Sequence, residues 1–292
     1  MKKVFNFNFR GREIVVEHGE MAKQAHGAVL VRYGDTVILS TAVVAPTANL
    51  LSDFFPLMVL YNEKLYSVGK IPGGFIKREG RPTDAATLAA RMIDRPLRPL
   101  FPEGFRNEVQ VVNTVLSVDK DNSPELTALL GSSLAVSISK IPFNGPVAAV
   151  KVGRVNGEFV INPTVAELEV SDIDLTVAGT KEAINMVEAG AREVSEQDML
   201  DALMFGHEAI KELISFEEEI IKEIGVEKME YPKLEIDDNL KQEVDEFCRN
   251  RIDTSLRIKD KLEKYAAIDK IKEDLTNKYK ELYEDVMKPN YY

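Results

Sequence analysis

The 292-residue sequence contains a single cysteine, Cys248, which excludes an internal disulfide and favours a reducing compartment. No stretch approaches the roughly 18 consecutive apolar residues that a membrane-spanning helix needs. The first residues, MKKVFNFNFRGRE, also contain no unbroken apolar run of the kind found in signal peptides. We therefore expect a cytoplasmic protein that does not contact a membrane.

The sequence also has few of the residue patterns that mark a complete active site. Its three histidines, His18, His26 and His207, are far apart and occur in no metal-binding spacing. There is no Gly-x-Ser-x-Gly elbow and no glycine-rich phosphate-loop motif. The carboxylate run Glu217–Glu219 is expected to face solvent on a helix. We predict no catalytic residue and no metal ligand from these patterns.

Negative charge predominates, with a formal net charge of -11 at pH 7. This argues against a protein that coats nucleic acid over its whole surface. The charge is nevertheless segregated, because residues 75–106 contain seven basic and four acidic side chains, a net charge of +3. A local anion-binding site is therefore compatible with the acidic composition.

Residues 1–210 have the patterns of a mixed α/β domain. FNFNF, residues 5–9, alternates as a half-buried strand does. Gly34–Asp35 and Asn156–Gly157 each lie between two β-branched runs, which predicts two hairpins. Residues 83–95 and 124–139 are rich in alanine and leucine at helical intervals. We predict an α+β fold with a mixed sheet.

Residues 211–292 differ in composition and predict an all-helical domain. Only one of the 17 glycines, Gly225, lies beyond residue 210. Apolar residues recur there every three or four positions, which predicts a one-faced helix whose stripe is buried core rather than a partner groove. The stripe consists of Ile268, Ile271, Leu275, Tyr279, Leu282 and Val286.

The segment FIKREGRP, residues 75–82, combines an aromatic ring with three cations between Gly74 and Pro82. Such a loop suits single-stranded RNA, since bases stack on Phe75 while cations contact phosphates without reading sequence. The cations are Lys77, Arg78 and Arg81. The alternative interpretation is a solvated surface turn without a ligand.

A second candidate anion-binding group follows on the helix that Thr83 is expected to cap. This helix carries Arg91, Arg95 and Arg98, of which the first two are four residues apart and share a face. The alternative is internal pairing of these arginines. The candidate partners are Asp84, Asp94 and Glu103.

The long segment IPGGFIKREGRPTDAATLAARMIDRPLRPLFPEGF closely resembles the first ribonuclease-PH-like core of bacterial polynucleotide phosphorylases. LVRYGDTVILSTAV, FFPLMVLY, KIPFNGPVAAVKVG and LMFGHEAI continue the resemblance in the same order, and it includes the helical domain that follows this core. It implies an RNA-binding half of a polyribonucleotide nucleotidyltransferase. Such enzymes degrade RNA from the 3′ end with phosphate, release nucleoside diphosphates, require magnesium or manganese, and form trimers of two-core subunits around a central RNA channel.

The resemblance also assigns the RNA-binding residues. In the family the matching loop usually reads Phe-Phe-Arg-Arg and grips single-stranded RNA at the channel entrance. Phe75, Arg78 and Arg81 match this pattern. Ile76 replaces the second aromatic ring, and Lys77 keeps the charge but loses the planar guanidinium.

The chemistry of the family lies in its second core, where an Asp-x5-Asp-x-Lys run binds metal and a serine-rich turn binds phosphate. In this chain the matching positions are Leu168, Asp174 and Thr176, and the serine turn aligns with Ser123–Glu125. A single carboxylate is a poor magnesium site. We therefore expect the amino-terminal part of a longer enzyme, with no metal bound by this chain and no activity without the second core.

Two other functions remain open at this stage. One is a non-catalytic ribonuclease-PH-type subunit of an exosome-like ring, although the long helical tail argues against it. The other is an architectural protein-docking module, which the net charge of -6 in residues 211–292 supports weakly. The expected partners are single-stranded RNA, the second core, further copies in a homotrimer, and other proteins of RNA degradation.

Overall fold

The computed structural model describes residues 2–48, 54–231 and 238–280. Contacts divide the chain into two compact units. The first, called the core unit below, comprises Met1–Ala48 and Pro56–Tyr231. The second, called the helical unit, comprises Asn49–Phe55 and Pro232–Tyr292.

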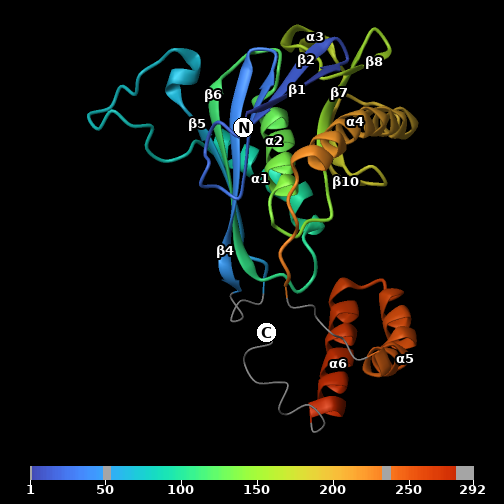
Figure 1. The fold of residues 1–292 in the computed structure, drawn as a ribbon. Coiled ribbons are helices and arrows are strands. Elements are labelled where there is room, and N and C mark those ends of the chain that lie inside the picture. Colours follow the sequence, from blue (N-terminus) through green and yellow to red (C-terminus); the bar gives the residue numbers. More distant parts are fainter. Residues whose placement is uncertain (1, 49–53, 232–237, 281–292) are drawn as a thin grey trace. The chain divides into compact units, whose positions relative to one another are not determined.

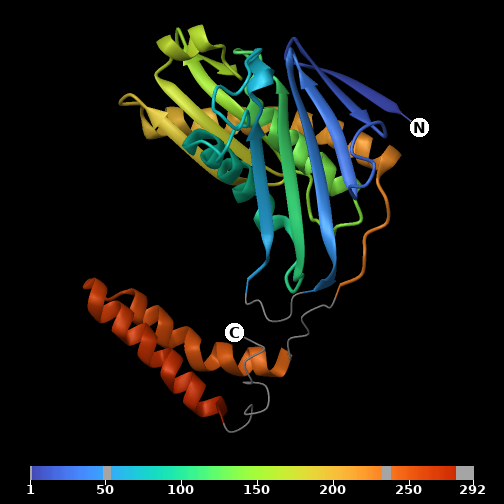
Figure 2. The same ribbon diagram turned by 90° about the vertical axis from the view of Figure 1, so that its left-hand side faces the viewer.

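Two sheets form the framework of the core unit (Figures 1 and 2). The larger has the strand order β1-β2-β3-β4-β6-β5, antiparallel except for the parallel pair β5 and β6. Its strands are β1 (Lys3–Phe9), β2 (Arg12–His18), β3 (Gly27–Tyr33), β4 (Thr36–Ala48), β5 (Leu57–Glu63) and β6 (Asn107–Ser117). The smaller is antiparallel with the order β10-β9-β7-β8. Its strands are β7 (Ala148–Val155), β8 (Glu158–Ile161), β9 (Ile173–Gly179) and β10 (Ile184–Ala191).

The predicted strand and hairpins are confirmed. Residues 5–9 lie in β1, whose side chains alternate between more and less exposed positions. Gly34–Asp35 forms the two-residue connection between β3 and β4, and Asn156–Gly157 connects β7 to β8. Asn156 and Gly157 have φ values of 53° and 84°, the left-handed conformation that a two-residue hairpin turn requires.

Helix α2 (Pro124–Ile138) lies between the two sheets and contacts strands of both (Figure 1). Every residue from Leu126 to Ile138 is buried. The helix can be buried all round because its side chains are apolar or small on every face, as expected of a helix enclosed by other elements. The predicted α+β fold with a mixed sheet is therefore confirmed.

Helices α1 and α4 also pack on this framework. Helix α1 (Asp84–Leu97) contacts β5, and the Thr83 hydroxyl caps it by accepting the Ala86 N–H at 3.0 Å. Helix α4 (Glu196–Ile224) packs on the smaller sheet and contacts α2. The short elements are η1 (Leu65–Val68), η2 (Arg98–Leu100) and α3 (Val165–Val170).

Helix α4 crosses the boundary that composition suggested after residue 210. It continues without a break to Ile224, and the core unit reaches Tyr231. Its buried face includes Leu213, Ile214 and Ile220, and Glu217 lies on the same face. The expectation that the whole run Glu217–Glu219 faces solvent was therefore wrong for Glu217, because its helical position directs it into the core.

The described part of the helical unit contains two packed helices, α5 (Asp238–Leu256) and α6 (Lys261–Lys280). Of the predicted apolar stripe, Ile271 is buried and Ile268, Leu275 and Tyr279 are half-buried. The stripe residues Leu282 and Val286 lie outside the described residues. Within the described ranges, no helix has the length and apolar character needed to cross a membrane.

Candidate nucleic-acid interface

The segment of residues 64–83 connects β5 to α1 and is called the basic loop below. It extends away from the larger sheet (Figure 1). At its tip, the Lys77 N–H donates to the Gly74 carbonyl at 3.1 Å, so that Phe75 and Ile76 occupy the centre of a turn. The Phe75 ring is fully exposed. Lys77 itself has a φ of 55°, a left-handed conformation that is uncommon for a residue with a side chain.

Glu79 holds the base of the basic loop together. Its carboxylate accepts the Leu65 N–H at 3.4 Å and lies 3.9 Å from the Lys64 ammonium. Hydrogen bonds from its own N–H and from that of Leu65, together with the Lys64 charge, lower the pKa of Glu79. These contacts hold the two ends of the basic loop together, and the tip with Phe75 extends beyond them.

Three cations near the tip of the basic loop have no acidic partner among the described residues. Lys77, Arg78 and Arg81 are all exposed. Across residues 2–48, 54–231 and 238–280, no carboxylate forms an ion pair with any of these three side chains. The structure thus brings the sequence-predicted RNA-binding residues Phe75, Lys77, Arg78 and Arg81 together on one loop.

The arginines of α1 differ from those of the loop. Arg98 donates to both carboxylate oxygens of Asp94 at 2.8 and 2.7 Å and to the Leu57 carbonyl at 3.1 Å. Arg95 forms an ion pair with Glu188 of β10, a partner that sequence reasoning did not consider. Arg91 is exposed and has no acidic partner among the described residues. Internal pairing therefore accounts for Arg95 and Arg98 but not for Arg91.

The positions that match the family's metal-binding run do not form a metal site. Leu168 lies in α3, and Asp174 of β9 forms an ion pair with Lys151 at 3.0 Å. Within the described residues, no cluster of three or more histidine, cysteine or acidic side chains has the geometry to hold a metal ion. The Asp174 carboxylate is already neutralised by a lysine, and the two other positions, Leu168 and Thr176, provide no charge.

The positions that match the phosphate-binding turn have a structural role instead. The Ser123 hydroxyl accepts the Leu126 N–H at 3.3 Å and donates to Glu125 at 2.7 Å, which caps α2. Pro124 is the first residue of α2 and has no N–H to offer a phosphate.

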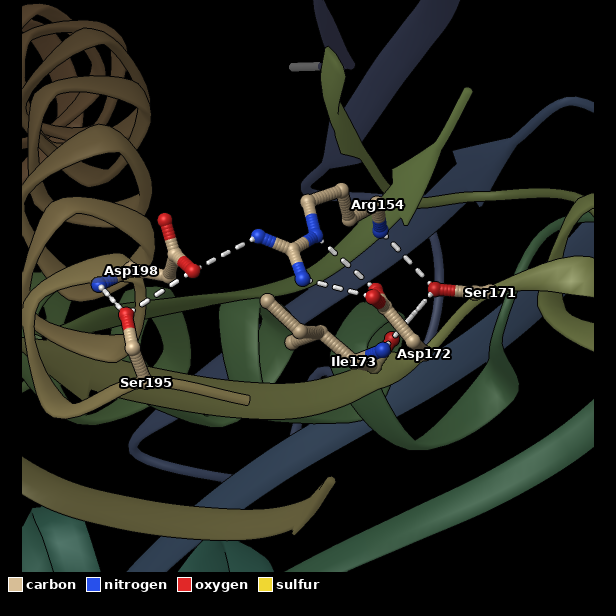
Figure 3. Close-up of polar contacts among 6 residues, drawn as sticks. All are labelled: Arg154, Ser171, Asp172, Ile173, Ser195 and Asp198. Carbon is tan, nitrogen blue, oxygen red and sulfur yellow. Dashed lines mark hydrogen bonds and ion pairs between the residues drawn. The ribbon is translucent and has the colours of Figure 1, made fainter. Parts of the chain in front are cut away.

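A nearby polar cluster joins β7, the start of β9 and α4 (Figure 3). Arg154 binds Asp172 through Nε at 2.9 Å and Nη2 at 2.5 Å, and Asp198 through Nη1 at 3.1 Å. The Arg154 guanidinium lowers the pKa of Asp172, and Ser195 and then Arg154 lower the pKa of Asp198. All three charges have partners within the cluster, which indicates a structural function.

Sequence reasoning missed two aromatic residues, one within the basic loop and one just before it. Tyr66 of η1 is 56% exposed and has no ring contact with any other described residue, so it is a further surface for stacking. Tyr61 of β5 is 3% exposed, and its hydroxyl has no hydrogen-bond partner within the described ranges. Tyr66 lies in no sequence motif that marks a binding site, and the burial of Tyr61 depends on tertiary contacts.

Three family models match the chain. Residues 10–142 match the 3′ exoribonuclease family, domain 1, and residues 145–209 match domain 2 of that family. Residues 239–290 match the polyribonucleotide nucleotidyltransferase RNA binding domain. Together these models account for both the core unit and the helical unit.

Individual proteins agree with the family models. The chain is 57% identical over 284 residues to a polyribonucleotide nucleotidyltransferase of Enterococcus faecalis, covering 97% of this chain and 40% of that protein. It is 58% identical over 278 residues to the one of Bacillus anthracis, covering 95% of this chain and 39% of that protein. The chain thus spans about 40% of the length of the curated relatives it matches.

Among solved structures, rice Rrp46 has a similar fold, with a TM-score of 0.55 at 14% identity, covering 76% of this chain and 94% of that one. At this identity the likeness concerns the fold alone. Fold, family models and sequence identity agree: the chain belongs to the 3′ exoribonuclease family and matches the amino-terminal part of its bacterial polyribonucleotide nucleotidyltransferases.

Proposed function

We propose that this chain is the RNA-binding and scaffold half of a polyribonucleotide nucleotidyltransferase. In this proposal the whole enzyme degrades single-stranded RNA from the 3′ end by phosphorolysis and releases nucleoside diphosphates during mRNA turnover in the cytoplasm. The observation that carries the proposal is the basic loop, where the fully exposed Phe75 ring adjoins three cations without acidic partners among the described residues.

The loop supports binding without sequence preference. A base stacked on an aromatic ring contributes about 1–3 kcal/mol, and each cation that neutralises a phosphate adds a salt-sensitive contribution. Phe75 provides the ring, and Lys77, Arg78 and Arg81 provide the charge. Arg91, exposed on α1, is proposed as a further phosphate contact, whereas the paired Arg95 and Arg98 would first have to leave their carboxylates.

The proposal assigns bond cleavage and the metal ion to a second core of the same enzyme. The matching positions in this chain do not fit magnesium or manganese, because Asp174 is paired with Lys151 and neither Leu168 nor Thr176 offers a carboxylate. The proposed partners are therefore single-stranded RNA, the second core, two further copies in a homotrimer, and other proteins of RNA degradation. We propose no membrane contact.

RNA binding by the 292-residue chain as a function of salt concentration tests this proposal. The triple variant Phe75→Ala, Lys77→Ala and Arg78→Ala is expected to bind an adenine decamer at least tenfold more weakly. Its slope of log K against log salt concentration is expected to be less steep by about 1.4, because two phosphate contacts are lost.

A matched triple variant controls for general loss of apolar and positive surface. Met21, Lys23 and Arg192 are exposed residues of the core unit outside the basic loop. Their replacement by alanine is expected to leave most of the affinity and a slope close to that of the wild type. Equal binding by the wild type and the loop variant would remove the basic loop from the proposed function.

A further inference from the structure

A pocket of about 840 Å³ lies in the core unit at the base of the basic loop. Its lining includes residues of η1, Arg78, Arg81 and the first turns of α1 and α2, represented by Thr83 and Pro124. The volume is within the range of small-molecule sites. Two guanidinium groups beside the N-terminus of α1 favour an anionic ligand group.

Tyr61 provides an independent indication that the pocket takes a ligand. It lines the pocket, its side chain is 3% exposed, and its hydroxyl has no partner within the described residues. Buried hydroxyls in folded proteins usually have a hydrogen-bond partner, so an unpaired one requires an explanation such as a missing ligand group. Burial, and then the charges of Glu125 and Glu63, raise the pKa of Tyr61, so the hydroxyl stays protonated and available as a donor.

The charges around the pocket are mixed, which disfavours a simple anion as its ligand. Glu63 and Glu79 line it together with the two arginines, and Glu63 accepts a long hydrogen bond of 3.5 Å from Thr83. Inorganic phosphate would be attracted by the arginines and repelled by the carboxylates. A nucleotide carries an anionic phosphate at one end and hydroxyl or amino donors at the other, and its base has apolar faces. Apolar side chains for those faces are present at Leu65, Val68, Pro82 and Val118.

We propose that this pocket binds one nucleotide, with its phosphate on Arg78 and Arg81 and its sugar or base hydrogen-bonded to the Tyr61 hydroxyl. The inference rests on the proposed function, since Arg78 and Arg81 contribute to both. The nucleotide comes either from a bound RNA strand or from free nucleoside diphosphate. Both sources present the same chemistry to the pocket.

Calorimetric titration of the 292-residue chain with ADP, inorganic phosphate and an adenine decamer tests this. Tyr61→Phe removes only the hydroxyl and is expected to weaken ADP binding by about five- to tenfold. The same variant should keep or raise the melting temperature, because it removes a buried hydroxyl that has no partner. Arg81→Met, a change at an exposed residue, is expected to weaken ADP binding by about tenfold.

Tyr33→Phe is the matched control. Tyr33 is also buried, but its hydroxyl accepts a hydrogen bond from Asn162 at 3.2 Å and it does not line this pocket. This variant is expected to lower the melting temperature and to leave ADP affinity unchanged. The two tyrosines should thus give opposite results in stability and binding.

The outcomes distinguish the two sources of the nucleotide, and they also distinguish failure of this inference from failure of the proposed function. If Tyr61→Phe weakens binding of the decamer as much as binding of ADP, the nucleotide in the pocket belongs to the RNA strand. If it weakens binding of ADP alone, the ligand is free nucleotide. Three results would overturn the inference: the chain does not bind ADP, it binds inorganic phosphate as tightly as ADP, or Tyr61→Phe binds ADP with unchanged affinity. Phe75 does not line the pocket, so decamer binding that depends on Phe75 without any ADP binding would overturn the inference and leave the proposed function intact.

Discussion

Replacing Glu217 by glutamine is expected to stabilise the core unit at neutral pH. Glu217 is fully buried in α4, and no hydrogen bond of normal geometry from another described residue reaches either carboxylate oxygen. Burial raises its pKa well above the ordinary value of 4.5, which the nearby Ser133 hydroxyl opposes in part and the Glu218 charge reinforces. A neutral amide of the same shape avoids the cost of ionising this buried group.

The magnitude follows from proton binding. The unfolded chain releases the Glu217 proton near pH 4.5, whereas the folded chain keeps it to a higher pH. The folded state therefore binds this proton more tightly in this window, and the Glu217 contribution to stability falls as pH rises, by about 1.4 kcal/mol per pH unit up to the folded pKa. Because glutamine does not titrate, the stability advantage of Glu217→Gln grows at the same rate.

Urea unfolding followed by circular dichroism at pH 5, 6 and 7 measures this difference. Glu218→Gln is the matched control, because Glu218 is exposed and pairs with Lys181 at 2.8 Å on the surface. Surface pairs contribute about 0–1 kcal/mol, so the control is expected to show a small effect that hardly changes with pH. Parallel pH profiles for wild type and Glu217→Gln would refute the reasoning, because Glu217 would then have an ordinary pKa in the folded state.

Two further substitutions test the loop and the packing. Tyr66→Ala is expected to weaken binding of an adenine decamer at least fivefold in a fluorescence titration, since one stacked base contributes about 1–3 kcal/mol, whereas Tyr66→Phe should bind normally. Gly27→Ala would place a Cβ atom 1.9 Å from the Ala135 carbonyl oxygen in α2. It is expected to destabilise the core unit by about 3 kcal/mol in thermal unfolding, whereas Gly73→Ala, with open space around its Cβ, should leave stability unchanged.

Local sequence signals predicted those parts of the fold that depend on a few neighbouring residues. The two-residue hairpins at Gly34–Asp35 and Asn156–Gly157 follow from turn chemistry, and the Thr83 cap follows from helix-terminus chemistry. Glu217 was predictable too. It is four residues after Leu213 and three before Ile220, which places it on the buried face, but its charge was given more weight than its position.

The sequence could not predict pairings between distant segments. Arg95 and Glu188 are 93 residues apart and meet only because α1 packs near β10. Likewise, Lys151 reaches Asp174 because β7 and β9 are neighbouring strands of the smaller sheet. Turn, cap and periodicity rules act within a few residues, so neither pair leaves a local signal.

The pattern of paired and unpaired cations in the core unit argues for a ligand at the basic loop. Arg10, Arg98 and Arg154 each bind a carboxylate at 2.5–2.7 Å. The cations at 77, 78 and 81 have no such partner among the described residues, although the chain carries a net charge of -11. They adjoin Phe75. Its ring is exposed, so the fold lacks the roughly 1.5–3 kcal/mol of stabilisation that burying such a side chain provides. Neither feature stabilises the isolated fold, but both would contribute in the proposed complex with single-stranded RNA.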